Sequence, residues 1–293
     1  MLKSGIIIVL KPTGLSSSDV VSRMRKILGT RQVGHLGTLD PAGTGVLPIS
    51  YGTATKLFDY YLKKDKVYRA MFKFSVETNT LDSDGEVIHR DDKIITKNDI
   101  LSILPQFIGK IKQVPPKVSA VHINGRRAYD LERNHVEFNI PFKEVEIFDI
   151  KVADTDTINL FQFDIHCSAG TYIRSLARDI AVGLNTFATM VSIIRMKSGS
   201  FLIEDAHATE EIAQNPEKYT ISIENALSSE KNIEINNEDY YRFKTGQEIF
   251  LNKEYDQVNI EFVAILFNNK VIALAEINNG KLIIKSRFNN EDK

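Results

Sequence analysis

Apolar positions near the start of the chain follow two different periods, which predict a strand followed by a helix. Residues 6–10 form an unbroken apolar and mostly β-branched run, typical of a buried strand. Residues 20–28 then carry apolar side chains at helical spacing, and Ser18 or Asp19 is the expected helix cap. Residues 66–74 alternate apolar and polar side chains, which predicts a half-buried strand.

The later segments continue this mixed order. Helices are expected at residues 55–62, 100–107 and 173–180, and strands at residues 144–152, 160–167, 262–267, 271–277 and 281–285. From about residue 228 the composition shifts toward Asn, Glu and Lys, and the Asn279-Gly280 pair predicts a hairpin turn. The chain therefore reads as one large α/β domain followed by a small β domain.

Residues 34–48 interrupt these periods with four glycines, two prolines, one histidine and one acid. Glycine and proline break helices and central strands, so this stretch is expected to be a shaped loop. By local chemistry alone, Asp40 before Pro41 is more often a turn or helix cap than a reacting group. His35 alone is likewise more often structural than catalytic.

The composition indicates which class of protein the chain belongs to. With 43% hydrophobic and 26% charged residues, the chain resembles an ordinary globular protein. Cys167 is the only cysteine, so no internal disulfide can form, and the six histidines offer no zinc spacing. Residues 6–10 are too few for a signal segment or a membrane span, which predicts a cytoplasmic protein without a membrane partner.

The distribution of charge along the chain is more informative about nucleic-acid binding than the net charge. The formal net charge of -1 gives no bulk support for nucleic-acid binding. Residues 1–35 nevertheless hold six Lys and Arg against one acid, whereas residues 204–261 hold 14 acids against five bases. A basic front is compatible with a face that follows an RNA backbone, although solvated helices also carry such charges.

Several motifs together resemble one family. Residues 34–48, Gly-His-Leu-Gly-Thr-Leu-Asp-Pro-Ala-Gly-Thr-Gly-Val-Leu-Pro, resemble the catalytic loop of the TruB family of tRNA pseudouridine synthases. Residues 168–176, Ser-Ala-Gly-Thr-Tyr-Ile-Arg-Ser-Leu, resemble its second signature. Shorter matches occur at residues 11–17 and 65–69, and the resemblance spans roughly residues 5–201.

The resemblance implies a mixed α/β (α+β) pseudouridine synthase fold with a largely antiparallel central sheet. It places the catalytic domain at residues 1–228, with an RNA-clamp insertion at about residues 113–141. Residues 243–247 and the strands after them resemble the small PUA domain, here expected at residues 229–293.

The resemblance also implies the roles of individual residues. Asp40, Tyr68 and Arg174 are expected to be catalytic. Arg174 would keep Asp40 ionised, since a guanidinium can hold a carboxylate in a two-point fork, and Tyr68 would accept or relay the proton that leaves carbon 5 of the base. The residues expected to bind substrate or RNA are His35, Tyr172, Ile193, Lys11, Arg126 and Arg127.

These six residues are expected to act in different ways. His35 would fill the space that a flipped base leaves, while Tyr172 and Ile193 would line the base pocket. Lys11 would support the wall of the site. Arg126 and Arg127 belong to the basic cluster of the clamp insertion.

The activity implied is that of a stand-alone enzyme that isomerises uridine 55 in the TΨC loop of tRNA. The base is flipped out, the glycosidic bond is cleaved with Asp40, and the base rotates and is rejoined through carbon 5. Asp40 either attacks the ribose or removes a sugar proton, and the sequence leaves both open. No cofactor, metal or guide RNA is expected, and we expect a monomer with tRNA as its partner.

Some residues depart from the family pattern. They are Leu10, Gly43, Val118, His122 and Ile194. Three other functions remain open: a guide-RNA-dependent relative, an RNA-binding protein without chemistry, and a glycosylase that releases free uracil. The clamp insertion argues against the first, because a stand-alone enzyme needs its own grip on RNA. Retention of the three catalytic residues argues against the second.

Overall fold

The computed structural model describes residues 3–118, 122–123, 126–127 and 138–288. Its largest element is a nine-stranded sheet with the order β1-β3-β12-β4-β11-β10-β7, to which β2 and β13 add at the side of β3 and β12. The strands are β1 (Gly5–Lys11), β2 (Val33–His35), β3 (Thr44–Tyr51), β4 (Lys66–Phe74), β7 (Gly109–Gln113), β10 (Lys143–Asp154), β11 (Leu160–Cys167), β12 (Ala188–Ser198) and β13 (Phe201–Leu202).

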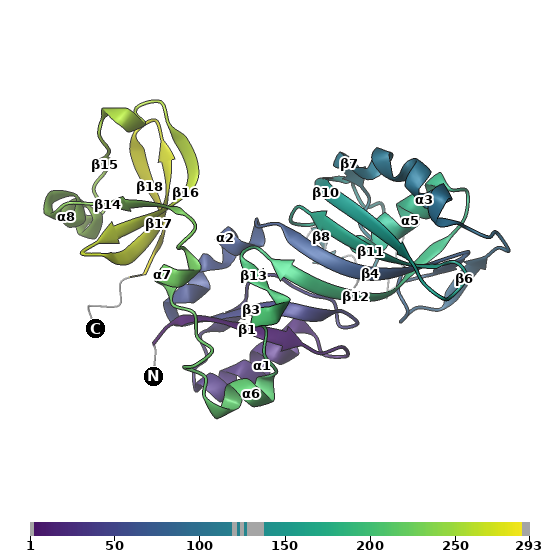
Figure 1. The fold of residues 1–293 in the computed structure, drawn as a ribbon. Coiled ribbons are helices and arrows are strands. Elements are labelled where there is room, and N and C mark those ends of the chain that lie inside the picture. Colours follow the sequence, from purple (N-terminus) through teal and green to yellow (C-terminus); the bar gives the residue numbers. More distant parts are fainter. Residues whose placement is uncertain (1–2, 119–121, 124–125, 128–137, 289–293) are drawn as a thin grey trace.

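Nearly all neighbours in this sheet are antiparallel, which confirms the predicted sheet type. The parallel contact is between β12 and β3, where Ile194 lies opposite Thr44 and Arg195 opposite Gly45. This contact joins the part of the sheet made by β1–β3 to the part made by β4, β11, β10 and β7 (Figure 1). A loop that leaves β2 and enters β3 is thereby held beside β12 and β4.

Helices cover the sheet in two places. The helices are α1 (Ser17–Leu28), α2 (Phe58–Leu62), α3 (Lys97–Ile103), α5 (Ile173–Gly183), α6 (Thr209–Gln214), α7 (Ile223–Ala226) and α8 (Asn237–Thr245). Short 3-10 turns are η1 (Gly52–Leu57), η2 (Leu104–Phe107), η3 (Ile203–Asp205) and η4 (Lys253–Tyr255). In Figure 1, α3 and α5 lie at the end of the sheet formed by β10 and β11, and α1 lies by β1 and β3.

The apolar stripes predicted from the sequence form the cores under these helices. Leu176, Ala177 and Ile180 of α5 pack with Phe72 and Phe163 of the sheet, all of them fully buried. The stripe of α1 packs on β1 and β3 in a second apolar cluster. Burial of such side chains is the main force that holds each helix to the sheet.

The predicted cap of α1, Ser18 or Asp19, was wrong. Ser16, not Ser18, is the N-cap, and its hydroxyl accepts a hydrogen bond from the Asp19 N–H at 3.1 Å. The Asp19 carboxylate accepts in turn from the Ser16 N–H at 2.9 Å. This reciprocal capping box extends the helix back into the turn that precedes it.

The C-terminal part forms a separate five-stranded sheet with the order β14-β16-β17-β18-β15. Its strands are β14 (Lys231–Glu234), β15 (Ile249–Phe250), β16 (Asn259–Phe267), β17 (Lys270–Asn278) and β18 (Lys281–Arg287). Asn279 and Gly280 both have positive φ, 47° and 75°, in the predicted hairpin turn between β17 and β18. This β unit is consistent with the predicted PUA-like domain.

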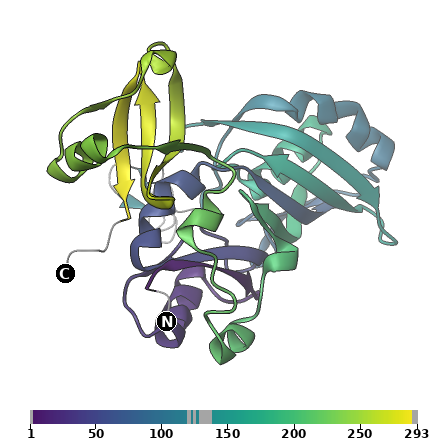
Figure 2. The same ribbon diagram turned by 60° about the vertical axis from the view of Figure 1, so that its left-hand side comes forward.

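The two sheets share an apolar cluster. Ala264 and Leu274 of the C-terminal sheet lie in one cluster with Leu57 and Tyr60, which belong to η1 and α2. Figure 2 shows the C-terminal sheet next to α2 and α7, away from α5. The predicted division between residues 228 and 229 stays a prediction.

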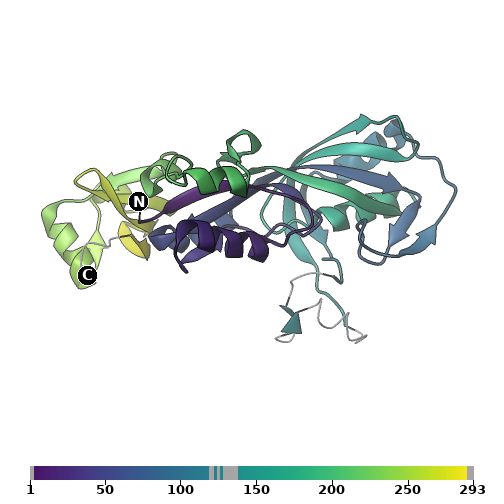
Figure 3. The same cartoon turned by 90° about the horizontal axis from the view of Figure 1, so that it is seen from below.

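Two small ribbons complete the fold. β5 (Val76–Thr78) pairs with β6 (Val87–Arg90), and β8 (His122–Ile123) pairs with β9 (Arg126–Arg127). In Figure 3 the pair β8–β9 lies apart from the main sheet. The rest of the predicted clamp between residues 119 and 137 lies outside the described residues. Among the helices that the structure describes, none is long and apolar enough to span a membrane.

Candidate active site

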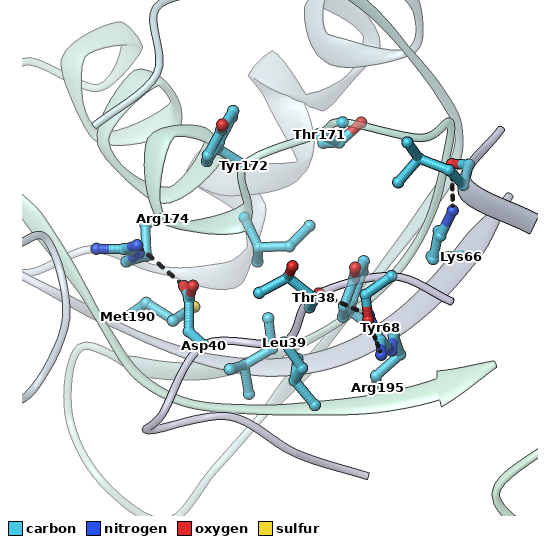
Figure 4. A pocket seen from close by; sticks show the side chains of 15 residues that line it. Thr38, Leu39, Asp40, Lys66, Tyr68, Thr171, Tyr172, Arg174, Met190 and Arg195 are labelled. Carbon is cyan, nitrogen blue, oxygen red and sulfur yellow. Dashed lines mark hydrogen bonds and ion pairs between the residues drawn. The ribbon is translucent and has the colours of Figure 1, made fainter. Parts of the chain in front are cut away.

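A pocket of about 280 Å³ opens where four distant segments of the chain meet (Figure 4). They are the loop between β2 and β3, strand β4, the turn that leads into α5, and strand β12. Five of the nine residues predicted to form the site line this pocket: Asp40, Tyr68, Tyr172, Arg174 and Ile193. The fold therefore brings together residues that are up to 153 positions apart.

Asp40 begins a tight turn, as its local sequence suggests. Its carbonyl accepts a hydrogen bond from the Gly43 N–H at 3.0 Å. Its carboxylate does not cap this turn but points toward Arg174, which is 134 residues away in the chain (Figure 4). The side chain is 47% exposed, so the carboxylate is accessible from the pocket.

Lys11 holds the Asp40 turn by hydrogen bonds to its backbone. Its ammonium donates to the carbonyls of Pro12 at 2.9 Å, Pro41 at 3.1 Å and Gly43 at 2.6 Å. Burial lowers the pKa of Lys11 to about 8, and the nearby charge of Asp40 opposes this shift. The residue is fully buried, so it has a supporting position and not an exposed one from which to contact RNA.

Arg195 is a second buried cation at the same loop. Its guanidinium donates to the carbonyls of Val46 at 2.7 Å, Thr38 at 2.9 Å and Gly37 at 3.0 Å. The backbones also approach closely, because a Cβ on Gly45 would lie 2.4 Å from the Arg195 carbonyl oxygen. Gly45 has φ of +107°, and only glycine fits this position without strain. The loop is thus fixed from two sides.

Arg174 connects several parts of the site. Its Nη2 donates to Asp40 Oδ2 at 2.9 Å and to the Val118 carbonyl at 3.2 Å. Its Nη1 lies 3.1 Å from Asp82 Oδ2 and donates to the Thr80 carbonyl at 3.0 Å. The predicted two-point fork on Asp40 is therefore absent from the described structure, since one nitrogen serves each carboxylate.

A strained turn presents Asp82 to this guanidinium. Leu81 has φ of +63°, a conformation that costs a non-glycine residue about 1 kcal/mol. Hydrogen bonds of 2.6 Å run from the Thr78 hydroxyl to the Asp82 carbonyl and from the Thr80 hydroxyl to Asp82 Oδ1. These bonds hold the turn so that both the Thr80 carbonyl and the Asp82 carboxylate face Arg174.

Tyr68 lies on β4 directly opposite Arg195 of β12 and Ile165 of β11. Burial raises the pKa of its phenol, and the positive charge of Arg195 opposes this shift. Tyr68 is therefore a neutral phenol at physiological pH. It lies in the pocket that Asp40 also lines.

Tyr172 and Ile193 supply apolar surface to the same pocket. Ile193 is almost fully buried and lies opposite Ala70 of β4. Tyr172 immediately precedes α5, and its N–H donates to the Gln113 side-chain oxygen at 2.8 Å. Burial and the nearby charge of Asp40 raise the pKa of the Tyr172 phenol.

His35 and Lys11 do not line the described pocket. His35 ends β2, opposite Ile49 of β3. Its Nδ1 is buried without a hydrogen-bond partner in the described structure, and burial lowers its pKa. Arg126 and Arg127 form the short strand β9, and their side chains lie outside what the structure describes.

Sequence reasoning did not single out three polar residues at the site. Arg195 follows Ile193 by two positions on one strand, and this spacing puts both on one face of the sheet. Asp82 lies 92 positions before Arg174, and no local pattern in the sequence indicates that these two residues pair. Lys66 lines the pocket, and its ammonium donates to the carbonyls of α2 residues Tyr61 at 3.3 Å and Leu62 at 2.9 Å.

Lys66 is also electrostatically unusual. Burial lowers the pKa of its ammonium to about 8, and the charge of Arg195 acts in the same direction. Its third carbonyl partner is Lys64, at 2.5 Å. All three ammonium protons therefore face backbone carbonyls, and Lys66 closes the end of α2 beside the pocket.

No group of three or more His, Cys, Asp or Glu side chains within the described ranges could hold a metal ion. The two acids at the site, Asp40 and Asp82, both contact Arg174. What the pocket offers is thus a positioned carboxylate, a neutral phenol and an apolar wall.

Comparison with known proteins gives consistent results. Residues 25–173, just over half of the chain, match the N-terminal domain of the TruB family of pseudouridylate synthases. The chain is 40% identical over 261 residues to a tRNA pseudouridine synthase B from Clostridium perfringens, covering 88% of each chain. It is 34% identical over 291 residues to one from Caulobacter vibrioides, covering 95% of this chain and 94% of the relative.

Solved structures show the same fold at lower identity. A chain of an H/ACA RNP bound to a substrate RNA superposes with a TM-score of 0.73 at 20% identity. It covers 98% of this chain and 86% of the other. A chain of a Cbf5-Nop10-Gar1 complex superposes with a TM-score of 0.74 at 22% identity, covering 98% and 84%. At such identities the likeness concerns the fold alone.

Proposed function

Because the chain belongs to the TruB family of pseudouridylate synthases, we propose that it isomerises uridine 55 in the TΨC loop of tRNA to pseudouridine. The curated relatives are named as tRNA pseudouridine synthases, which supports tRNA as the substrate. We further propose that residues 1–228 form the catalytic domain, that residues 229–293 form a PUA-like domain, and that the enzyme acts as a monomer without a guide RNA.

One observation carries this proposal. Asp40 lies at the mouth of a pocket of about 280 Å³, and a buried guanidinium contacts its carboxylate at 2.9 Å. Arg174, whose side chain is only 8% exposed, holds the Asp40 carboxylate in one position in the pocket, as either attack on the ribose or removal of a sugar proton requires.

The pocket walls suit a flipped uracil. A base in a structured RNA loop must leave its stack before chemistry can occur on it. Tyr68, Tyr172 and Ile193 offer the aromatic and apolar surface on which a pyrimidine ring can lie. His35, at the start of the stretch that resembles the catalytic loop, is our candidate for the side chain that fills the vacated space.

Tyr68 completes the proposed reaction. After Asp40 opens the glycosidic bond and the base has turned, carbon 5 joins the ribose and must lose its proton. Tyr68 is neutral because burial raises its pKa. A neutral phenol can relay this proton by accepting it as it releases its own to water, and N1 of the uracil, which has lost its bond to the ribose, takes up a proton in turn, so that the product is an isomer of the substrate.

The competing functions have less support. The folds of the H/ACA complexes are similar, but an identity of 20–22% carries no argument for a guide RNA or protein partners. A protein that only binds RNA needs neither the Asp40–Arg174 pair nor the Tyr68 phenol. A glycosylase would use the same first step but would release uracil.

The test is release of tritium from a tRNA transcript labelled at carbon 5 of uridine. Wild type should release one tritium per tRNA, and Asp40→Asn should release none while binding the same RNA. A transcript with cytidine at position 55 serves as the control for position. Release of free uracil would identify a glycosylase, and tight binding without release of either product would leave an RNA-binding protein.

A further inference from the structure

One pair of facing residues in the main sheet brings two hydrogen-bond donors to the start of α5. Gln113 ends β7 and lies directly opposite Lys143, the first residue of β10. Lys143 is four positions before Ile147 of the same strand, and the buried side chain of Ile147 belongs to the apolar cluster that contains Leu176 and Ile180 of α5. Because side chains two positions apart share a face, Gln113 and Lys143 also face α5.

The side-chain amide of Gln113 has one hydrogen-bond donor without an acceptor among the described residues. Its side-chain oxygen accepts the Tyr172 N–H at 2.8 Å, and this contact fixes which end of the amide is oxygen. Its Nε2, on the same amide carbon, is buried without a partner in the described part of the chain. Gln113 is fully buried, and an unpaired buried donor is costly and calls for an explanation.

Lys143 lies across the rim of the pocket. A Cβ on Gly170 would come within 2.4 Å of Lys143 Nζ and 3.1 Å of Lys143 Cε, so the lysine side chain rests on the Gly170 backbone. Gly170 and Thr171 both line the pocket. Lys143 is exposed, and no carboxylate among the residues described lies within ion-pair distance of its ammonium.

The N-terminus of α5 adds a second positive electrostatic contribution beside the Lys143 ammonium. α5 has 11 residues and no side-chain cap at Tyr172, so its first N–H groups and its dipole face the same rim. Asp40, the acid of the described pocket lining, contacts Arg174 instead. The Lys143 ammonium, which has no ion-pair partner among the described residues, and the N-terminus of α5 therefore meet beside Gly170 of the pocket lining, with the Gln113 amide buried next to Tyr172.

We propose that Lys143 and the Gly170–Tyr172 turn bind a backbone phosphate of the RNA, next to the nucleotide that enters the pocket. The proposal rests on the proposed function, which brings an RNA strand to this rim. A phosphodiester offers the acceptor oxygens and negative charge that these groups lack. Gln113 is a positioning residue, since it orients Tyr172 and adds its amide dipole to the site.

The test is binding of a labelled T-arm RNA hairpin at several salt concentrations, with Lys143→Ala, Lys143→Arg and Lys151→Ala compared with wild type. Lys151 is the matched control, because it is an exposed lysine of the same strand that lies by Asp149 at 3.8 Å. Lys143→Ala should weaken binding about ten-fold. It should also reduce the slope of log K against log salt by about 0.7. Lys143→Arg should recover most of the affinity.

Replacing single phosphates of the RNA by uncharged methylphosphonates locates the phosphate that Lys143 contacts. A methylphosphonate at the phosphate that Lys143 binds should weaken wild type as much as Lys143→Ala does, and should weaken Lys143→Ala no further. The proposal is overturned if Lys143→Ala binds the RNA as Lys151→Ala does. It is also overturned if, at every phosphate that flanks the target uridine, the methylphosphonate weakens Lys143→Ala as much as it weakens wild type.

The same RNA, labelled with tritium, separates this proposal from the proposed function. If wild type binds the hairpin but releases no tritium, the proposed function fails, and the binding data alone decide on the phosphate contact. If wild type does not bind the RNA, both proposals fail.

Discussion

Asp40 and Asp82 are bound by opposite ends of one guanidinium. Arg174 Nη2 lies 2.9 Å from Asp40, and Arg174 Nη1 lies 3.1 Å from Asp82. Asp82 is nearly buried, whereas Asp40 is half-exposed to the pocket. Asp82 and the Thr80 carbonyl therefore fix the orientation of Arg174, and Arg174 in turn fixes Asp40, the one carboxylate in the described pocket lining.

We expect Arg174→Lys to be a poor replacement. A lysine has one nitrogen and a flexible stem, so it cannot contact Asp40 and Asp82 in this geometry. Loss of one charge-assisted hydrogen bond costs about 1.5–3 kcal/mol, which corresponds to about 10- to 100-fold in kcat if it acts on the reacting carboxylate. Single-turnover tritium release measures this, and an unchanged rate would show that any cation suffices beside Asp40.

The control for that variant lies one turn further along α5. Arg178 donates to the Val114 carbonyl and to Asp179 and does not line the pocket. Arg178→Lys should keep the wild-type rate within about two-fold, because Arg178 contacts neither Asp40 nor Asp82 and its substitution leaves the pocket lining unchanged.

Asp82→Asn tests the second end of the guanidinium. The amide has nearly the shape of the carboxylate and keeps an oxygen for the Thr80 hydroxyl, but it removes the charge that faces Arg174. We expect kcat to fall about ten-fold or more with little change in RNA affinity. Asp84→Asn, in the same turn but exposed, is the matched control. Equal rates for the two variants would limit Asp82 to holding its own turn.

The sequence predicted much of this site for identifiable reasons. The strands and helices follow from apolar periods, and the turn around Asp40 follows from its glycines and prolines. The loop predicted for residues 34–48 was too long, because residues 34–35 end β2 and residues 44–48 belong to β3, a strand between β1 and β12. The aspartate, tyrosine and arginine came from family motifs, and the fold places all three around one pocket. What periodicity cannot supply is long-range pairing between polar side chains.

Asp82 and Arg195 illustrate this limit. The partner of Asp82 is 92 residues away, and the Arg195 guanidinium binds backbone carbonyls, which every residue has. No side-chain pattern records such contacts. The single-point contact on Asp40 was also beyond prediction, because it depends on a second carboxylate that competes for the same arginine.

Tyr68→Phe separates proton relay from stacking. The phenyl ring keeps the apolar surface, so RNA affinity should stay within about two-fold, whereas loss of general acid–base assistance should lower kcat by about 100-fold. Tyr172→Phe is the control, since that tyrosine lines the same pocket but has no proton to transfer in our scheme. Normal turnover by Tyr68→Phe would reduce Tyr68 to a stacking surface.

The buried ammonium of Lys11 gives a prediction about stability and pH. Its pKa is about 8 in the folded protein because of burial, against an ordinary value of 10.5. Between these values the unfolded chain binds a proton that the folded chain has lost, so this group makes the free energy of unfolding rise with pH. Below about pH 8 both states carry the proton, and the cost of burying the charge is present in full.

Urea unfolding of wild type and Lys11→Met between pH 7 and pH 10 measures this effect. The free energy of unfolding of wild type relative to the variant should be constant up to about pH 8 and then rise, by at most about 1.4 kcal/mol per pH unit. Lys26→Met, which removes an exposed lysine of α1, should show a difference from wild type that does not change with pH. A flat difference for Lys11→Met would mean that the ammonium under the Asp40 turn keeps its proton throughout, and that its three carbonyl contacts outweigh its burial.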